Sequence, residues 1–286
     1  MSMFRYFDSL NDGKFLKVES DRLSETINFV KQEKIENLYI SRCHGYHLDS
    51  IEPLLELKGI KKLQYQEHGD MISMIGIEKF KDLEYLRIDD EQKVDLSAFP
   101  ALRFLIIKWS KKIKNFEKCD NLKELNLWNF NTKEKDFSNF PFLKGLEILN
   151  LFWGNAQTLD NLQLGDRIHK IEFHRYPKLE TASKLVDYKS IEYLYFENCK
   201  RVNDFERLSE LPNIKTFAFN ECGELDNIDF VENMGKLEDI RFVGTNIKNG
   251  NLKMLEKDKF RYIGFDNKKH YSHKYEELKP IKNNKG

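Results

Sequence analysis

The sequence predicts an α/β solenoid, in which one curved parallel sheet of about eleven strands is connected by short helical or 3-10 turns on its convex side. A nine-residue frame, apolar-x-x-apolar-x-apolar-x-x-x, recurs in one register along the chain. Its fourth positions are Leu38, Leu63, Leu86, Leu105, Leu125, Leu149, Ile171, Leu194, Phe217, Ile240 and Ile263. From the first to the last they span 225 residues in ten steps, so the mean period is 22.5 residues. A fixed period of this length is the sequence signature of a repeat architecture.

The alternation inside each frame predicts which side chains enter the core. In the copy LEILNLFWG (Leu146 to Gly154), the apolar positions 4 and 6 are two residues apart, as on one face of a strand. We therefore expect positions 4 and 6 to be buried and positions 3, 5 and 7 to face the concave side. Position 8 should lie at the rim of that side.

The frame resembles the signature of the leucine-rich repeat family, LxxLxLxxN/CxL, whose period is about 20–29 residues. The resemblance covers roughly residues 35–268, and its cleanest copy is Ile191 to Asn213, where Cys199 and Val202 match the cysteine variant. The ninth position departs from the family elsewhere, which argues against a regular asparagine ladder. It holds His68, Glu91, Phe130, Gly154, Tyr176 and Lys268. The resemblance implies a horseshoe that binds partners on its concave face without catalysis.

Three regions are predicted: an N-terminal cap over 1–34, about eleven repeats over 35–268, and a C-terminal cap and tail over 269–286. The end segments of a solenoid must differ from its repeats because they cover the first and last turns. We expect a hairpin over 4–18 with its turn at Asn11 to Gly13, then a helix beginning at Ser20-Asp21. The C-terminal segment should fold over the last strand. Segments such as DFERLSEL and NIDFVENM should form the convex turns.

Composition excludes several classes of partner. The chain has 47 basic and 47 acidic residues, so it lacks the basic footprint of a protein that binds nucleic acid or anionic membranes. No segment approaches the roughly 18 apolar residues of a membrane span, and the start MSMFRYFDSL does not resemble a signal peptide. We therefore expect a cytoplasmic protein. The four cysteines, Cys43, Cys119, Cys199 and Cys222, are expected to be buried small apolar residues rather than disulfide partners.

The sequence offers little chemistry. It contains no GxSxG, GxxxxGK[ST], HExxH or CxxC motif. The segment CHGYH could place Cys43, His44 and His47 near a metal, with His68 one repeat away, and HYSH offers His270 and His273. A ladder cysteine followed by loop histidines explains the same residues more simply. We predict no enzyme activity, no metal and no cofactor.

The predicted concave face is rich in aromatic residues near its middle. Trp109, Trp128 and Trp153 fall in three consecutive repeats. The predicted partner-binding residues are Phe104, Ile106, Lys108, Trp109, Trp128, Ile148, Asn150, Phe152, Trp153, His174, Arg175, Tyr193 and Tyr195. Tyr39 is expected on the same face but away from this set. The alternative is a slip in strand register that tucks the tryptophans between strand and convex turn. An exposed apolar patch with a charged rim is typical of an interaction site.

We therefore predict non-catalytic binding of a protein partner by the concave face. A chain made only of irregular repeats looks similar to bacterial immunity proteins that neutralise a cognate toxin. The alternatives are a structural scaffold or adaptor of a larger complex and, less simply, a metal-dependent enzyme.

Overall fold

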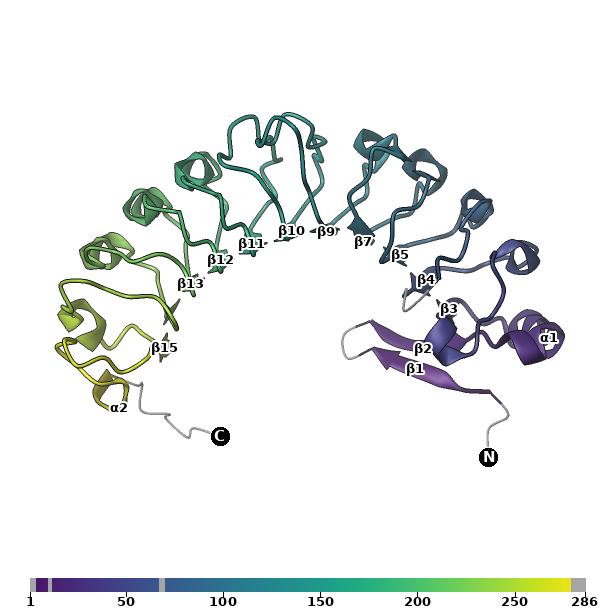
Figure 1. Cartoon of the computed structure of the whole chain (residues 1–286), viewed down its shortest axis with the longest axis horizontal. Helices are drawn as coiled ribbons and strands as arrows, with labels where there is room; N and C mark the ends of the chain where they lie inside the picture. The colour runs from purple at the N-terminus through teal and green to yellow at the C-terminus, as the bar shows by residue number, and fades with distance from the viewer. Residues whose placement is uncertain (1–3, 10–11, 67–69, 279–286) are drawn as a thin grey trace. The chain divides into compact units, whose positions relative to one another are not determined.

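The computed structural model describes residues 4–9, 12–66 and 70–278. The chain divides into two compact units, Met1–Trp128 and Asn129–Gly286, which are described here one at a time. In each unit, parallel strands line one side and short helices line the other (Figure 1). We call the strand side that carries frame positions 3, 5 and 7 the concave face, and the side of the short helices the convex side.

The first unit begins with an antiparallel hairpin, after which parallel strands alternate with short helices. Its strands are β1 (Tyr6–Ser9), β2 (Gly13–Lys17), β3 (Asn37–Ile40), β4 (Lys62–Tyr65), β5 (Tyr85–Ile88), β6 (Val94–Asp95), β7 (Phe104–Lys108), β8 (Ile113–Lys114) and β9 (Glu124–Trp128). Its helices are η1 (Ser20–Arg22), α1 (Leu23–Glu33), η2 (Arg42–His44), η3 (Glu52–Leu54), η4 (Ile77–Lys79), η5 (Leu96–Ala98) and η6 (Phe116–Lys118). The strand order is β1-β2-β3-β4-β5-β7-β9, and β6 pairs with β8 in a separate two-stranded sheet.

The second unit repeats one parallel strand and one convex turn several times. Its strands are β10 (Ile148–Phe152), β11 (Lys170–His174), β12 (Tyr193–Glu197), β13 (Thr216–Asn220), β14 (Asp239–Arg241) and β15 (Tyr262–Gly264). Its helices are η7 (Ser183–Asp187), η8 (Phe205–Glu210), η9 (Asp229–Asn233), η10 (Lys253–Glu256) and α2 (Tyr275–Leu278). The strands follow one another in sequence order from β10 to β15.

The predicted frame and fold class are confirmed. Within the described residues, eleven parallel strands carry the eleven predicted fourth positions, and these pair in register within each unit. Leu38 to Leu125 form one row, and Leu149 to Ile263 form the other. Every fourth position is at most 1% exposed, and the sixth positions are buried beside them. Each such side chain contributes roughly 1.5–3 kcal/mol when it leaves water. The predicted convex turns are also confirmed, as the 3-10 helices η8 and η9.

The sixth positions of the last five repeats form a column of phenylalanines. Phe173 stacks on Phe196 with ring centroids 5.2 Å apart, and Phe242 stacks on Phe265 at the same distance. Phe219 lies between these two pairs along the sheet and stacks on Phe242 at 5.7 Å. Aromatic rings in this geometry add to the stabilisation from area burial alone.

The eighth position turns the chain out of strands β9 to β14. Asn129, Trp153, Arg175, Asn198, Glu221 and Gly244 all have a left-handed backbone, with φ between 49° and 74°. For all of them except Gly244, the amide donates to the carbonyl of position 7 in the next repeat, as from Trp153 to His174 at 2.9 Å. This hydrogen bond offsets the cost of a conformation that L-residues seldom adopt.

The ninth position forms a short ladder of thiol and hydroxyl donors instead of asparagines. Cys199 donates its thiol to the carbonyl of Phe173, Cys222 donates to that of Phe196, and Thr245 donates its hydroxyl to that of Phe219. Each side chain therefore reaches back to position 6 of the preceding repeat. Burial raises the pKa of the Cys199 thiol to about 12.

The prediction that all four cysteines are buried is wrong for Cys43. Cys119, Cys199 and Cys222 are buried, but Cys43 is exposed. The reason is local, because residues 42–44 form the 3-10 helix η2. Its side chain therefore leaves the ladder at the first repeat.

Both ends of the described chain carry segments unlike the repeats. The predicted hairpin and helix are confirmed as β1–β2 and as η1 followed by α1, although Asn11 of the predicted turn lies outside the described residues. At the other end, Tyr271 and Tyr275 pack against Phe265 with ring centroids 6.0 Å from it in both cases. The predicted C-terminal segment thus covers the last repeat, while its final residues, 279–286, lie outside the described part.

Candidate partner-binding surface

The N-terminal hairpin occupies the concave face of the first repeats (Figure 1). Phe7 of β1 stacks on Tyr39 of β3 with ring centroids 4.5 Å apart, and Phe15 of β2 lies 5.7 Å from Tyr85 of β5. These rings form one cluster against which Ile106 of β7 also packs. The apolar side of the hairpin therefore covers positions that the repeat frame assigns to the open face.

Polar contacts hold the tip of the hairpin in place. Lys62 of β4 donates its ammonium to the carbonyl of Asp12 at 2.7 Å, and the Tyr85 hydroxyl donates to the Asp12 carboxylate at 3.4 Å. Asn37 of β3 donates its side-chain amide to the carbonyl of Lys14 at 3.0 Å. The tip is thus attached to three successive strands.

Tyr39 therefore does not lie on open surface as predicted. It is 1% exposed and Tyr85 is 3% exposed, because the hairpin covers both. A frame-based prediction assigns directions to the repeat residues and does not foresee a cap that folds back over them. The signal was the apolar pair Phe7 and Phe15, which face each other across the hairpin.

The predicted residues of the first unit that remain accessible lie on β7, β9 and the turn between them. Phe104 is 40% exposed, and Ile106, Lys108, Trp109 and Trp128 are partly exposed. Trp109 lies 6.4 Å from the ring of Phe116, which belongs to η6 on the convex side. Trp109 thus lies toward the convex turn, as expected if the tryptophans were tucked between strand and turn. The strand register of β7 has nevertheless not slipped.

The second unit pairs large aromatic rings with cations. The Phe152 ring stacks on the His174 imidazole with centroids 4.6 Å apart and an interplanar angle of 13°. The guanidinium of Arg175 lies 5.7 Å from the centroid of the Trp153 ring, a cation–π contact between neighbouring rim positions. Trp153 is 42% exposed, whereas Ile148 is half-buried and Asn150 is only 7% exposed. Asn150 therefore offers little surface to a partner.

The stretch LNLFWGN can now be explained. Phe152 ends the strand on the concave face, and Trp153 leaves it through the left-handed backbone at the rim. Gly154 follows because the ring of Tyr176, one repeat later, fills the space beside it. Two consecutive large aromatics are thus both kept out of the core.

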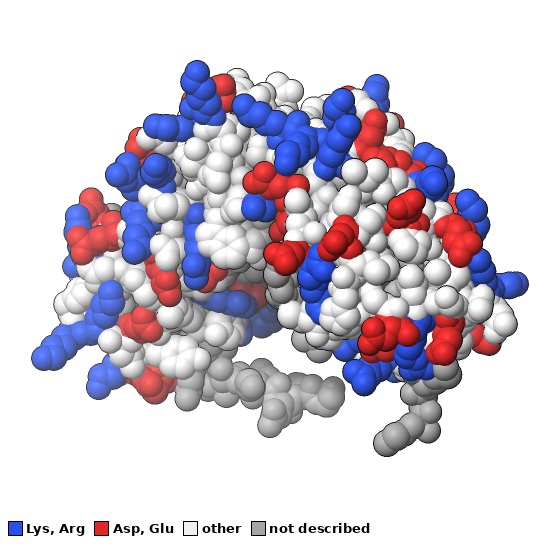
Figure 2. Space-filling view, turned by 45° about the vertical axis from the view of Figure 1, so that its right-hand side comes forward, with Lys and Arg blue, Asp and Glu red and all other residues white. Residues whose placement is uncertain are grey.

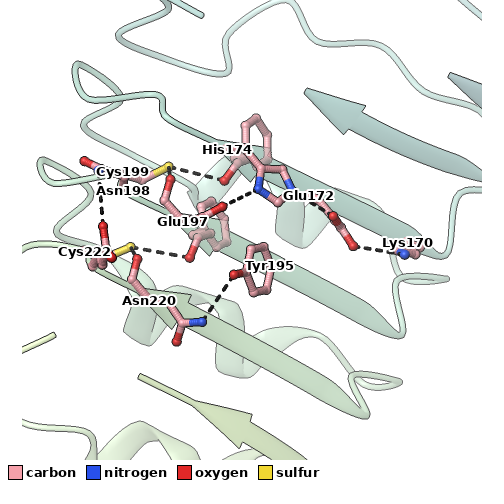
Figure 3. Close-up of polar contacts among 12 residues, drawn as sticks. Lys170, Glu172, His174, Tyr195, Glu197, Asn198, Cys199, Asn220 and Cys222 are labelled. Carbon is pink, nitrogen blue, oxygen red and sulfur yellow. Dashed lines mark hydrogen bonds and ion pairs between the residues drawn. The ribbon is translucent and has the colours of Figure 1, made fainter. Parts of the chain in front are cut away.

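His174 stands at the centre of a charged network on this face (Figure 3). Its Nδ1 lies 2.6 Å from Glu197 Oε2, and its Nε2 lies 2.8 Å from Glu172 Oε2. Lys170 pairs with the other oxygen of Glu172 at 2.9 Å. Burial alone would lower the pKa of His174, but the two carboxylate hydrogen bonds outweigh it and raise the pKa. Each ring nitrogen faces a carboxylate acceptor and can donate to it only when it carries a proton. The two carboxylates therefore favour the imidazolium form of His174.

Two tyrosines extend the surface beside this network. Lys170 places its ammonium 4.8 Å from the centre of the Tyr193 ring. Tyr195 lies 5.1 Å from the His174 ring, and its hydroxyl accepts a hydrogen bond from Asn220 at 3.3 Å. Burial raises the pKa of Tyr193 to about 12. Both rings are partly exposed and held in fixed orientations.

Neither a metal site nor a membrane helix was found in the described part of the chain. No group of three or more His, Cys, Asp and Glu side chains there could hold a metal ion. His68 lies outside the described residues. None of the helices in 4–9, 12–66 or 70–278 is long and apolar enough to cross a membrane. Lys, Arg, Asp and Glu are interspersed over the visible surface (Figure 2).

Comparison with known proteins identifies the repeats. Residues 146–270 match the BspA type leucine rich repeat region in 6 copies. None of the curated proteins compared with the chain matches it.

Among solved structures, the chain is similar to an internalin (inlF) of Listeria monocytogenes, with 15% identity, 87% of this chain and 91% of that chain covered, and a TM-score of 0.44. It is also similar to a leucine-rich-repeat protein of Leptospira interrogans, with 13% identity, 86% and 81% covered, and a TM-score of 0.44. A third is the functional domain of InlJ from Listeria monocytogenes, which includes a cysteine ladder. The identity is 16%, the chain covers 63% of that domain with 79% of its own length, and the TM-score is 0.35.

The repeated strands and their buried fourth positions define the class of fold, a leucine-rich-repeat solenoid. Residues 146–270 in particular are a leucine-rich repeat region of the BspA type.

Proposed function

We propose that the protein binds a protein partner, without catalysis, through the concave face of its repeats. The observation that carries the proposal is the surface formed in the second unit by Phe152, Trp153, His174, Arg175, Tyr193 and Tyr195. Tryptophan, tyrosine and arginine dominate binding hot spots, and side chains held in place lose little entropy on binding. In the first unit the proposed contacts are Phe104, Ile106, Lys108, Trp109 and Trp128, which remain at least partly exposed although Ile106 also packs against the hairpin cluster.

Site-specific photo-crosslinking tests this proposal. A photoreactive amino acid at Phe152 in cells should form a covalent adduct with one protein, whereas the same amino acid at Glu206, on the convex helix η8, should not. The partner is then purified, and its affinity is measured with Phe152→Ala, Tyr195→Ala and Glu206→Ala. The two concave-face variants should bind at least tenfold more weakly. Equal affinity for all three variants would refute binding by this face.

The partner that we propose is a cognate toxin, which would make the protein a cytoplasmic immunity protein. The support is the resemblance to bacterial immunity proteins made of irregular repeats. Co-expression of a toxin encoded beside the gene tests it directly. Wild-type protein should restore growth, and Phe152→Ala should restore it poorly.

A scaffold or adaptor is the alternative function. It would hold two partners at once, so crosslinks from both faces to different proteins would favour it over immunity.

A further inference from the structure

Arg241 ends β14 on the concave face of the second unit, at frame position 5. Its guanidinium lies 4.6 Å from the centre of the Tyr262 ring on the next strand. On the two neighbouring strands, the residues in register with it are Ala218 and Gly264. These residues have almost no side chain, so the arginine stands between small neighbours, and it is partly exposed.

No carboxylate of the described chain pairs with Arg241. Asp239 lies two residues earlier on the same strand, but Arg261 holds it, with Nη2 3.1 Å from Oδ2. Glu172 is held by Lys170 and His174, and Glu197 is held by His174. The nearby acidic groups of this face are therefore satisfied by other cations.

The Nε atom of Arg241 is buried and has no hydrogen-bond partner among the described residues. A charged donor withdrawn from water without an acceptor is unfavourable, so the fold leaves the guanidinium short of one hydrogen bond, and a ligand bound to the rest of the group can offset that loss. The planar guanidinium presents a fork of N–H groups that fits the two oxygens of a carboxylate. Cation–π contact with Tyr262 orients this fork before any ligand arrives.

We propose that Arg241 binds a carboxylate side chain, Asp or Glu, of the protein partner. The inference rests on the proposed function and specifies the chemistry that the partner presents at this point of the concave face. Tyr193 and Tyr195 stand on β12, two strands from Arg241, and Tyr262 stands beside it, so the acidic side chain would enter a surface lined by tyrosine rings. Partner binding would thus combine an aromatic area around Phe152 with one charge-specific contact at Arg241.

A small probe tests the site without the partner. The Nε–H signals of 15N-labelled arginine side chains are recorded by NMR, and Arg241→Lys assigns the signal of Arg241. N-acetylglutamate methylamide is then titrated against its glutamine analogue. The glutamate compound should shift the Arg241 signal saturably and at least fivefold more than the glutamine compound, and the Arg261 signal should stay nearly unchanged.

With these two compounds, either of two results would overturn the inference: equal shifts with both compounds, or equal shifts at Arg241 and Arg261. A phosphoserine analogue is the third arm, and stronger binding of it would overturn the assignment to a carboxylate.

The crosslinked partner separates this inference from the proposed function. Arg241→Gln should weaken that partner's binding at least tenfold, Arg241→Lys should weaken it less, and both variants should melt within a few degrees of the wild type. If Phe152→Ala weakens binding and Arg241→Gln does not, the proposed function stands and the role of Arg241 is refuted.

Discussion

The ring of Tyr176 fills the space beside Gly154, one repeat earlier in the second unit. A Cβ placed on Gly154 would lie 2.1 Å from two ring carbons and 2.4 Å from the hydroxyl oxygen of Tyr176. Both residues occupy frame position 9, and Tyr176 is fully buried. The glycine is thus required because the side chain of Tyr176 fills the space that a Cβ would take.

Gly154→Ala should therefore destabilise the protein. The methyl group forces the Tyr176 ring to move within a packed interior, which costs about 1–3 kcal/mol. Urea denaturation measures the change in the free energy of unfolding. Gly235→Ala is the matched control, because a Cβ there meets nothing within 4 Å. Equal stability for the two variants would contradict the account of Gly154.

Tyr176→Phe should leave the protein as stable or make it more stable. The Tyr176 hydroxyl is buried without a hydrogen-bond partner in the described chain, and such a group costs about 1–3 kcal/mol relative to one that is paired. The phenylalanine ring would still fill the space beside Gly154. Thermal unfolding measures the change, and a loss above about 1 kcal/mol would indicate that the hydroxyl is satisfied in solution.

The cysteines should differ in reactivity according to their exposure. Under native conditions a thiol reagent should label the exposed Cys43 quickly and the three buried cysteines slowly. Burial raises the pKa of Cys119 and of Cys199 to about 12, so little of either thiol is ionised at neutral pH. Mass spectrometry after timed labelling gives the rate at each site. Slow labelling of Cys43 would contradict its placement on the exposed helix η2.

The core of each repeat was predictable from the sequence, because strand periodicity leaves few choices. Positions 4 and 6 are apolar in every copy of the frame, as Leu149 and Leu151 are in one of them, and one register places all of them inside. The same argument predicted where Phe152 and Trp153 point. A pattern repeated eleven times corrects any single ambiguous copy.

Contacts between elements far apart in the sequence were not predictable in this way. The hairpin covers Tyr39 because Phe7 and Phe15 bring their own apolar surface to the concave face, and no repeat frame describes that segment. The frame predicted that Arg241 lies on the concave face. It did not predict that the nearby carboxylate of Asp239 pairs with Arg261 instead of Arg241. The network around His174 likewise depends on rotamers of Glu172 and Glu197.

Stability should depend on pH through His174 and Glu172. The raised pKa of His174 stabilises the folded state below its ordinary value of 6.5, and this contribution is lost as the pH rises through the folded value. Burial opposes ionisation of Glu172, but its hydrogen bonds to His174 and Lys170 prevail and lower its pKa. That contribution is present above 4.5 and is lost as the pH falls through the folded pKa.

The stabilisation by this pair should therefore be greatest between pH 4.5 and 6.5. His174→Gln should lower the free energy of unfolding there by up to about 1 kcal/mol, as for a partly exposed ion pair, and by less at pH 9. Urea denaturation of both proteins across pH gives the difference curve. A difference that grows toward pH 9 would mean that His174 is neutral in the folded protein.

Trp153 should behave as a binding residue and not as a core residue. Its indole is 42% exposed, so Trp153→Ala should change the free energy of unfolding by about 0.5 kcal/mol, as is usual for surface substitutions. Binding of the partner should weaken by roughly 2–4 kcal/mol if Trp153 is a central anchor.

Trp109→Ala should cost more folding stability, because that ring packs beside Phe116. Glu206→Ala on the convex side replaces Tyr39 as the control, since Tyr39 is buried under the hairpin. Both free energies are measured on the same preparations, one by urea denaturation and one by calorimetry with the purified partner. If Trp153→Ala lost stability and kept its affinity, the indole would be supporting the fold, and the partner would have to bind elsewhere.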